Sequence, residues 1–230
     1  MTSLPKKLDG LDIPVVIRRS PKARRISLKI DFYTHTAILI LPRHASETEG
    51  LKFAAQQRQW IDAQIQNLPE LIPFADGAII PIRGEDHRII HRGKGHGIVR
   101  STDKSLSVFG RPEHLASRLK DWLKRQARED INPLVIAKST KLGKRAGRIS
   151  IRDQKTRWGS CSANGNLSFN WRLILAPPFV LDYVVSHEVA NLAEHNHSKA
   201  FWRHVCELTE FRHDGQEWLR QKGKTLCRYG

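Results

Sequence analysis

The chain has 230 residues, of which 40% are hydrophobic, so it is long enough to bury a core as one large domain or two modest ones. No run approaches the ~18 consecutive apolar residues that span a bilayer, and the first ten residues lack the apolar stretch of a secretory signal. Cys161, Cys206 and Cys227 form no CxxC pair, which excludes a disulfide-stapled fold. We therefore expect a cytoplasmic protein that does not enter the membrane.

Charge gives the first indication of a partner. The 39 Lys and Arg residues exceed the 23 Asp and Glu residues, which gives a net charge of +16. Residues 111–157 hold 14 basic and 5 acidic residues, so this segment contributes 14 − 5 = +9. A positive surface attracts phosphates, which makes nucleic acid or a nucleotide a candidate partner for this segment. A basic surface that only keeps the protein soluble is the competing interpretation.

The first part of the chain, residues 1–110, predicts a β-rich domain with one helix. Ser46 and Glu49 form a capping-box signature, and an apolar stripe that includes Leu68 continues as far as Pro69. Alternating β-branched residues predict short strands, antiparallel in the first group, at 14–19, 24–32 and 36–41, and then at 78–83, 87–91, 98–100 and 105–108.

Residues 111–230 predict a second domain in which helices dominate. A long helix is expected from Pro112 to about Lys138, kinked or split at Pro133. Strands that bracket the turn 157–162 predict a small antiparallel sheet, and Gly159 in that turn suits a tight or positive-φ backbone. Strands that precede helices favour an α+β fold. The remaining elements are strands at 148–152 and 166–171 and helices that begin at 177–178, 198 and 215.

The chemistry is concentrated in a segment that reads His187-Glu188-Val189-Ala190-Asn191. Positions four apart on a helix share a face, and the H-E-x-x-H pattern uses that spacing to direct two imidazoles at one Zn²⁺. The glutamate between them polarises the water on the metal. Here His187 and Glu188 are present, but Asn191 stands where the second histidine would be. Alone, such a His-Glu pair is weak evidence for catalysis.

Four motifs in order make the evidence specific: RWGSCS at 157–162, NWRLILAPP at 170–178, DYVVSHE at 182–188 and NHSKAFW at 196–202. Together they resemble the YgjP-like metallopeptidase family, which is related to the SprT-like zincin proteases. The resemblance implies a zincin-like metallopeptidase domain over residues 111–230, a Zn²⁺ cofactor and a peptide or protein substrate. It also implies that His187 is the first metal ligand, Glu188 the general base and His197 the third ligand.

Asn191 falls where the family has its second histidine ligand, and three outcomes follow. Metal affinity could fall sharply, because zinc prefers nitrogen and sulfur donors to an amide oxygen, leaving an inactive homologue. The metal could instead be held by His187, His197 and either the Asn191 oxygen or a water. Recruitment of His195 is disfavoured, since on a continued helix it is rotated by ~80° from His187.

The resulting primary hypothesis is a zinc-dependent peptidase with an impaired metal site. The strand at 166–171 could align an extended peptide by edge addition, which makes Asn170 and Trp171 candidate substrate-binding residues, although Trp171 equally suits a core anchor. The first alternative is a metal-dependent nucleotide phosphohydrolase that uses the basic segment for phosphates. The second is a catalytically inactive homologue that binds nucleic acid or protein.

Overall fold

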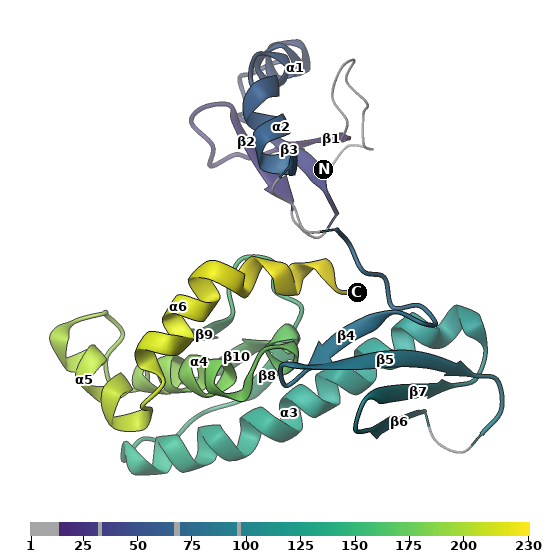
Figure 1. The fold of residues 1–230 in the computed structure, drawn as a ribbon. Coiled ribbons are helices and arrows are strands. Elements are labelled where there is room, and N and C mark those ends of the chain that lie inside the picture. The colour runs from purple at the N-terminus through teal and green to yellow at the C-terminus, as the bar shows by residue number, and fades with distance from the viewer. Residues whose placement is uncertain (1–13, 32–33, 67–69, 96–97) are drawn as a thin grey trace. The chain divides into compact units, whose positions relative to one another are not determined.

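A computed structural model describes residues 14–31, 34–66, 70–95 and 98–230 of the chain. The chain divides into two compact units, residues 1–70 and 71–230 (Figure 1). The division therefore falls well before the expected boundary near residue 110. Strands between residues 79 and 109 share one hydrophobic core with the helices that follow them, and this shared burial joins them to the second unit.

The first unit contains a three-stranded sheet in the order β1-β3-β2. β2 and β3 are antiparallel as expected, but β1 runs parallel to β3, so the prediction of three antiparallel strands is wrong for that pair. Alternating burial fixes which face of a strand points inward and carries no information on its direction. Of the strand expected at 24–32, Phe32 lies outside the described residues. The strands are β1 (Val15–Arg19), β2 (Ser27–Asp31) and β3 (Thr36–Leu41).

Two helices cover this sheet where one was expected: α1 (Glu47–Gln56) and α2 (Arg58–Gln66), separated at Gln57. The predicted capping box is confirmed, because the Ser46 side chain accepts from the backbone of Glu49 and the Glu49 side chain accepts from the backbone of Ser46. Leu68 and Pro69, at the expected helix end, lie outside the described residues. Buried side chains from β1, β3 and both helices form the core of this unit.

The second unit begins with a four-stranded sheet in the order β4-β5-β7-β6. Its β4–β5 turn uses Arg83 and Gly84, both at positive φ, and the two backbone N–H groups donate to Ile174 and Leu175. The turn is thereby fastened to the segment that leads into α4. The four strands are β4 (Ile79–Ile82), β5 (Glu85–Arg92), β6 (Val99–Thr102) and β7 (Ser105–Phe109).

A long helix, α3 (Leu115–Lys141), follows a single turn of 3₁₀ helix, η1 (Pro112–His114). α3 is continuous through Pro133, so of the expected kink or split the split does not occur. Proline removes one backbone hydrogen bond from a helix. Ile131 and Val135, buried on either side of Pro133, hold both halves against the same core.

A small sheet in the order β8-β10-β9 lies next to α3 and α4 (Figure 1). The strands expected at 148–152 and 166–171 are β8 and β10, and they run parallel, so the prediction of an antiparallel sheet is wrong for them. The antiparallel partner of β10 is β9, which lies in the segment expected to be a turn. The strands are β8 (Ile149–Arg152), β9 (Gly159–Cys161) and β10 (Leu167–Asn170).

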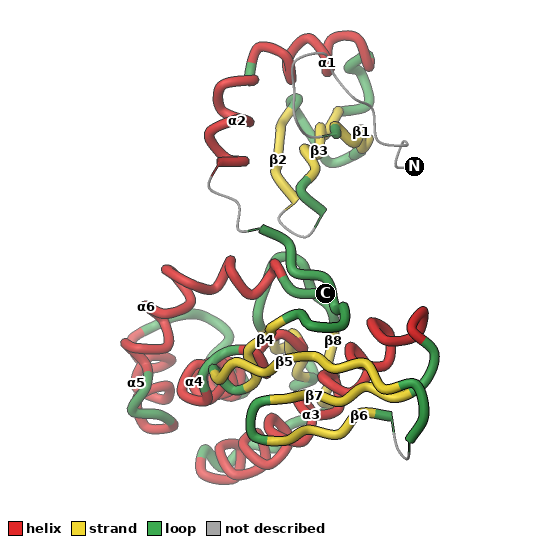
Figure 2. Tube along the Cα trace, turned by 45° about the vertical axis from the view of Figure 1, so that its right-hand side comes forward, coloured by secondary structure: helices red, strands yellow, loops and turns green. Residues whose placement is uncertain are grey.

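Helices complete the second unit, and α4 packs between α3 and α6 (Figure 2). The order of strands first and helices later confirms the α+β class. None of the helices in the described ranges is both long and apolar enough to cross a bilayer. The remaining elements are η2 (Trp171–Leu175), α4 (Pro178–Ala190), α5 (Lys199–Leu208), α6 (Arg212–Lys222) and η3 (Gly223–Arg228).

Candidate metal centre

The last turn of α4 carries the two residues that open the sequence motif. The helix begins at Pro178, whose fixed φ suits a first helical turn. Most of its residues are buried in the core of the second unit. The helix ends at Ala190, and Asn191 forms its C-cap. His187 and Glu188 are therefore fixed in place by a rigid, buried element.

His197 meets His187 after the turn that follows α4. Ser198 caps α5 by accepting a hydrogen bond from the backbone N–H of Phe201 at 3.3 Å, and Asn196 accepts one from the backbone N–H of Ser198 at 3.3 Å. These bonds hold His197 just ahead of α5. Its ring centroid lies 5.0 Å from that of His187, so two imidazoles ten positions apart in sequence share one region of space.

Aromatic side chains line the two imidazoles. The Phe201 ring centroid lies 5.0 Å from that of His187 and 4.6 Å from that of His197, and Trp202 lies 5.9 Å from both. Burial, assisted by the nearby charge of His197, lowers the pKa of His187 to about 4. His187 is therefore neutral at pH 7 and keeps a lone pair for a ligand. Its Nδ1 is buried and has no hydrogen-bond partner among the described residues.

Glu188 is a buried carboxyl group next to the backbone of β9. Burial raises the pKa of Glu188 to about 7, although the charge of Arg157 and a hydrogen bond from Asn191 act in the opposite direction. A Cβ atom at Gly159 would lie 2.5 Å from Cγ of Glu188, which only a glycine avoids. Gly159 is a strand residue without a positive φ, so the turn role expected for it is wrong. The close approach to Glu188 is the reason for glycine.

Asn191 occupies the position where a third protein ligand is needed. Its side-chain Nδ2 donates to the backbone carbonyl of His187 at 3.1 Å, which uses the amide to close the end of α4. His195 is exposed in the following turn. Within the described parts of the chain, no group of three or more His, Cys, Asp or Glu side chains is placed to hold a metal ion. The two imidazoles fit a zinc site, and the third position does not.

The strand expected to receive a peptide has no free edge. β10 is bonded to β8 on one side and to β9 on the other. Asn170 is 1% exposed and Trp171 is 0% exposed. The Asn170 side chain donates to the backbone of Gln154 and accepts from that of Arg172, while Trp171 packs in the core. Burial therefore argues against both as substrate-binding residues.

The edge strands of this sheet are β8 and β9, and β9 is the one that packs next to α4. The backbone carbonyl of Trp158 accepts from the N–H of Asn170 at 2.8 Å, and Ser160 pairs with Ser168 of β10. Backbone groups alternate in direction along a strand, so those of Gly159 and Cys161 face away from β10. An extended chain added at this edge would run beside Glu188, because Gly159 contacts that side chain. The sequence pattern did not distinguish β9 from the turn around it.

Comparison with known proteins gives one family match. The family described as YgjP-like, metallopeptidase domain, matches residues 24–222, which is most of the chain and includes residues of both units. The chain belongs to the YgjP-like family. Its metallopeptidase class implies a metal, usually zinc.

Similarity to individual proteins is much weaker for this YgjP-like chain. One solved structure, the metallopeptidase zymogen of Pyrococcus abyssi abylysin, is 23% identical, and the match covers 40% of this chain and 93% of that chain at a TM-score of 0.35. A similarity this low supports no conclusion about the chain. No curated protein matches it.

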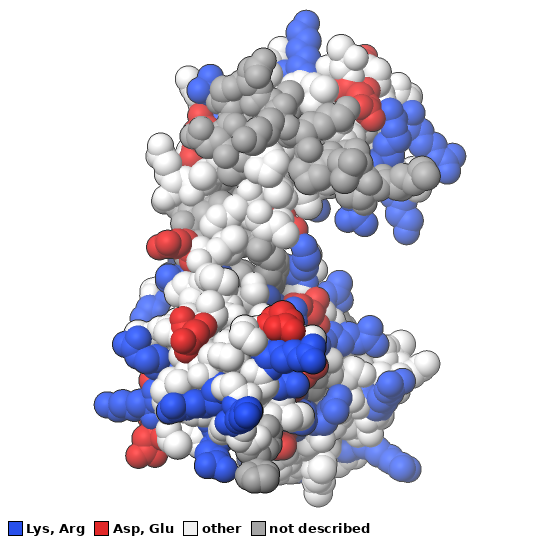
Figure 3. Space-filling view, turned by 90° about the vertical axis from the view of Figure 1, so that its right-hand side faces the viewer, with Lys and Arg blue, Asp and Glu red and all other residues white. Residues whose placement is uncertain are grey.

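Some basic side chains of the segment 111–157 in this YgjP-like chain form ion pairs within the fold. Lys138 is buried and lies 2.8 Å from Asp182, and Lys120 lies 2.6 Å from Asp153. On the face drawn in Figure 3, Lys and Arg side chains are spread over the second unit rather than gathered in one patch. The net charge of the segment therefore overstates the charge that it offers to a partner.

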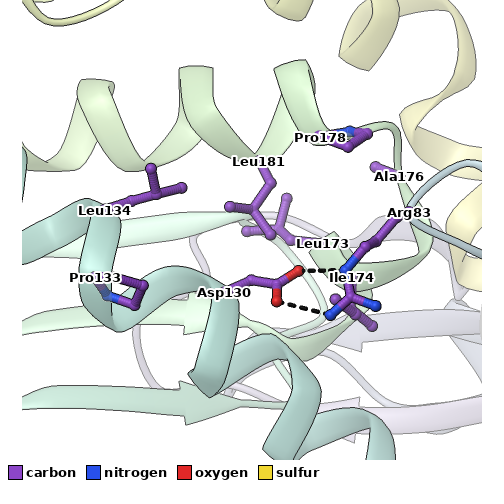
Figure 4. A pocket seen from close by; sticks show the side chains of 9 residues that line it. All are labelled: Arg83, Asp130, Pro133, Leu134, Leu173, Ile174, Ala176, Pro178 and Leu181. Atoms are coloured by element: carbon purple, nitrogen blue, oxygen red, sulfur yellow. Dashed lines mark hydrogen bonds and ion pairs between the residues drawn. The ribbon is translucent and has the colours of Figure 1, made fainter.

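A separate pocket of about 340 Å³ lies between α3, η2 and the start of α4 (Figure 4). Its walls are apolar, with Leu134 and Leu181 facing across it. Its polar residues are Arg83 and Asp130, which bind each other at 2.7 and 2.8 Å. The lining includes none of the candidate metal ligands, so we do not assign the chemistry of the family to this pocket.

Proposed function

We propose that this chain is a peptide-bond hydrolase of the metallopeptidase class, with a zinc site weakened by Asn191. One observation carries the proposal. The His187 and His197 rings lie 5.0 Å apart at the end of α4, and Glu188, the neighbour of His187 in the same helical turn, lies against Gly159 of the edge strand β9. Membership of the YgjP-like metallopeptidase family supports the same reaction class.

The peptide would bind as an added strand along β9. Backbone N–H and C=O groups of Gly159 and Cys161 would pair with the main chain of the substrate, which gives affinity without demanding particular side chains. Since Gly159 contacts Glu188, a peptide bond aligned at this point lies next to the carboxyl group. Gly159 would thus have two roles: its backbone would pair with the substrate, and its lack of a side chain leaves room for Glu188.

Glu188 would accept the proton of the attacking water. A general base works best when its pKa is close to the working pH, and burial raises the pKa of Glu188 to about 7. His187 and His197 would hold the metal through neutral imidazole nitrogens. When bound, a metal ion of this class polarises the peptide carbonyl and activates water. The residues that supply these functions come from one helix and one turn.

Asn191 would limit how tightly the metal binds. Catalytic zinc sites use three protein ligands and one water, and this chain offers two imidazoles. We expect the Asn191→His variant to bind Zn²⁺ at least about 100-fold more tightly than the native chain, because imidazole is a much better zinc ligand than an amide. The variant should also hydrolyse an unfolded protein such as casein faster at limiting zinc.

Titration calorimetry with Zn²⁺ on the native chain and on Asn191→His tests the metal site. Arg203→His is a matched control, because it adds an imidazole at an exposed position of α5, outside the ligand position. Equal, tight binding by the native chain and Asn191→His would contradict a weakened site. Absence of peptide hydrolysis by zinc-loaded Asn191→His would contradict the hydrolase itself.

A further inference from the structure

Arg157 is an exposed cation at the entrance to β9. It lies two positions before Gly159, the residue that contacts Glu188. Its charge acts on Glu188, which indicates that the guanidinium group lies near that carboxyl group. A substrate strand that follows β9 beside Glu188 would therefore pass the Arg157 side chain.

Arg157 has no carboxylate partner within ion-pair distance in the described part of the chain. Other arginines of the second unit are paired: Arg172 with Asp153, and Arg83 with Asp130. An arginine without a partner keeps its planar set of donors available for a carboxylate, which it can bind through two parallel hydrogen bonds. Arg157 thus differs from these arginines in being available to a ligand.

A second cation lies on the aromatic side of the centre. Arg212, the first residue of α6, stacks over Trp202 at 4.4 Å from the ring centroid. Trp202 in turn lies 5.9 Å from the rings of both His187 and His197. One guanidinium group therefore acts on Glu188, and a second lies over the tryptophan that neighbours both imidazoles. Such a distribution favours an anionic ligand.

We propose that this site selects peptides with an acidic side chain close to the bond to be cut, and that Arg157 binds that carboxylate. The inference rests on the proposed function, because it assumes that a peptide lies along β9. Charge complementarity of this kind mainly determines which partner is chosen. The proposal also predicts that the preference for acidic peptides weakens as the salt concentration rises, because salt screens charge–charge interactions over ~8 Å at physiological ionic strength.

Three fluorescent peptide libraries, identical except for one position fixed as Glu, Gln or Lys, test this proposal with the full-length chain. Binding is measured by fluorescence anisotropy on the native chain, Arg157→Gln and Arg152→Gln. Arg152 is the matched control, because it ends β8 at the opposite edge of the same sheet. Circular dichroism establishes that both variants are folded.

The native chain should bind the Glu library about fivefold more tightly than the Gln library, with the Lys library weakest. Arg157→Gln should lose this order, and Arg152→Gln should keep it. Equal binding of all three libraries by the native chain, or a preference that survives in Arg157→Gln, would overturn the proposed selection of acidic peptides by Arg157. Either result would leave the proposed function in place. An equal loss in both variants would reduce the effect to net charge and would overturn the role of Arg157. Binding of no library would overturn the proposed function as well.

Discussion

Two carboxyl groups on α4, the partly exposed Asp182 and the buried Glu188, have opposite surroundings. Asp182 lies 2.8 Å from the ammonium group of Lys138 and accepts a hydrogen bond from the Thr209 hydroxyl, and Lys138 also donates to the backbone carbonyl of Leu208. Glu188, six positions later, has no cation within ion-pair distance in the described part of the chain, and burial raises its pKa to about 7. The Asp182 group is satisfied and joins α3 to α4 and the end of α5.

The difference separates scaffold from site within one helix. Buried charges that are fully paired hold a structure together, whereas a buried carboxyl group that lacks such a partner costs stability and is retained where chemistry needs it. The unpartnered Nδ1 of His187 belongs to the same end of α4 as Glu188. Substitutions at Asp182 should therefore affect mainly stability, and substitutions at Glu188 mainly activity.

The largest effect on stability is expected for Lys138→Met. The substitution leaves Asp182, which is 20% exposed, without its cation, which should lower the free energy of unfolding by about 3 kcal/mol, the lower end of the range for a buried pair. Urea unfolding followed by circular dichroism measures the loss. The double variant Lys138→Met/Asp182→Leu should recover part of it, since no unpaired charge remains. A loss below about 1 kcal/mol in the single variant would contradict a scaffold role for this pair.

Gly159→Ala should be the next most damaging change. The new methyl group would overlap Glu188, and relieving that overlap should cost about 1–3 kcal/mol of unfolding free energy. Peptide hydrolysis by the Asn191→His protein should fall at the same time, because the carboxyl group is displaced. Ser160→Ala on the same strand is the control and should change neither property. An alanine at 159 with unchanged stability and activity would show that β9 and Glu188 do not make this contact.

Glu188→Gln should separate activity from stability. It removes a buried carboxyl group that has no ion-pair partner, and the amide oxygen can still accept the hydrogen bond from Asn191, so the unfolding free energy should stay equal or rise by about 1 kcal/mol. Hydrolysis by the Asn191→His protein should fall by about 10²–10⁴-fold, which is the usual contribution of a general base. Asp182→Asn is the comparison within the same helix and should lower stability. If Glu188→Gln lowers the unfolding free energy by as much as Asp182→Asn does, the two carboxyl groups of α4 do not differ in the way described.

The smallest loss of stability is expected for substitution of Asp153, which is half exposed. Burial alone would raise its pKa, but hydrogen bonds and charges from Lys120 and Arg172 outweigh burial and lower the pKa to about 2. An acid with a lowered pKa stabilises the fold above its unfolded value of 3.8, and this contribution is lost as pH falls toward 2. With allowance for solvent screening, Asp153→Asn should lose about 1 kcal/mol at pH 7.

Unfolding measured at several pH values tests the Asp153 effect. The difference between the native chain and Asp153→Asn should be constant above pH 5 and should shrink through the range from pH 4 to pH 2. A difference that stays constant down to pH 2 would mean that the carboxylate charge is not responsible for it.

Local signals in the sequence predicted much of the fold. The capping box at Ser46 and Glu49 marked the start of α1, and the proline pair at 177–178 marked the start of α4. Strand direction was not predictable, because alternating burial is the same for parallel and antiparallel pairs. The division after residue 70 was also missed, since it depends on which elements share a core.

The sequence by itself determined the family, the residue types of the candidate centre and the asparagine at the position of the second histidine ligand. Only the tertiary structure decided that β9 is an edge strand, that Gly159 makes room for Glu188, and that Asn170 and Trp171 are buried. Motif residues are recognised from their types and spacing along the chain. Contacts between β9 and α4 join segments about thirty positions apart, and such contacts cannot be predicted from the local sequence of either segment.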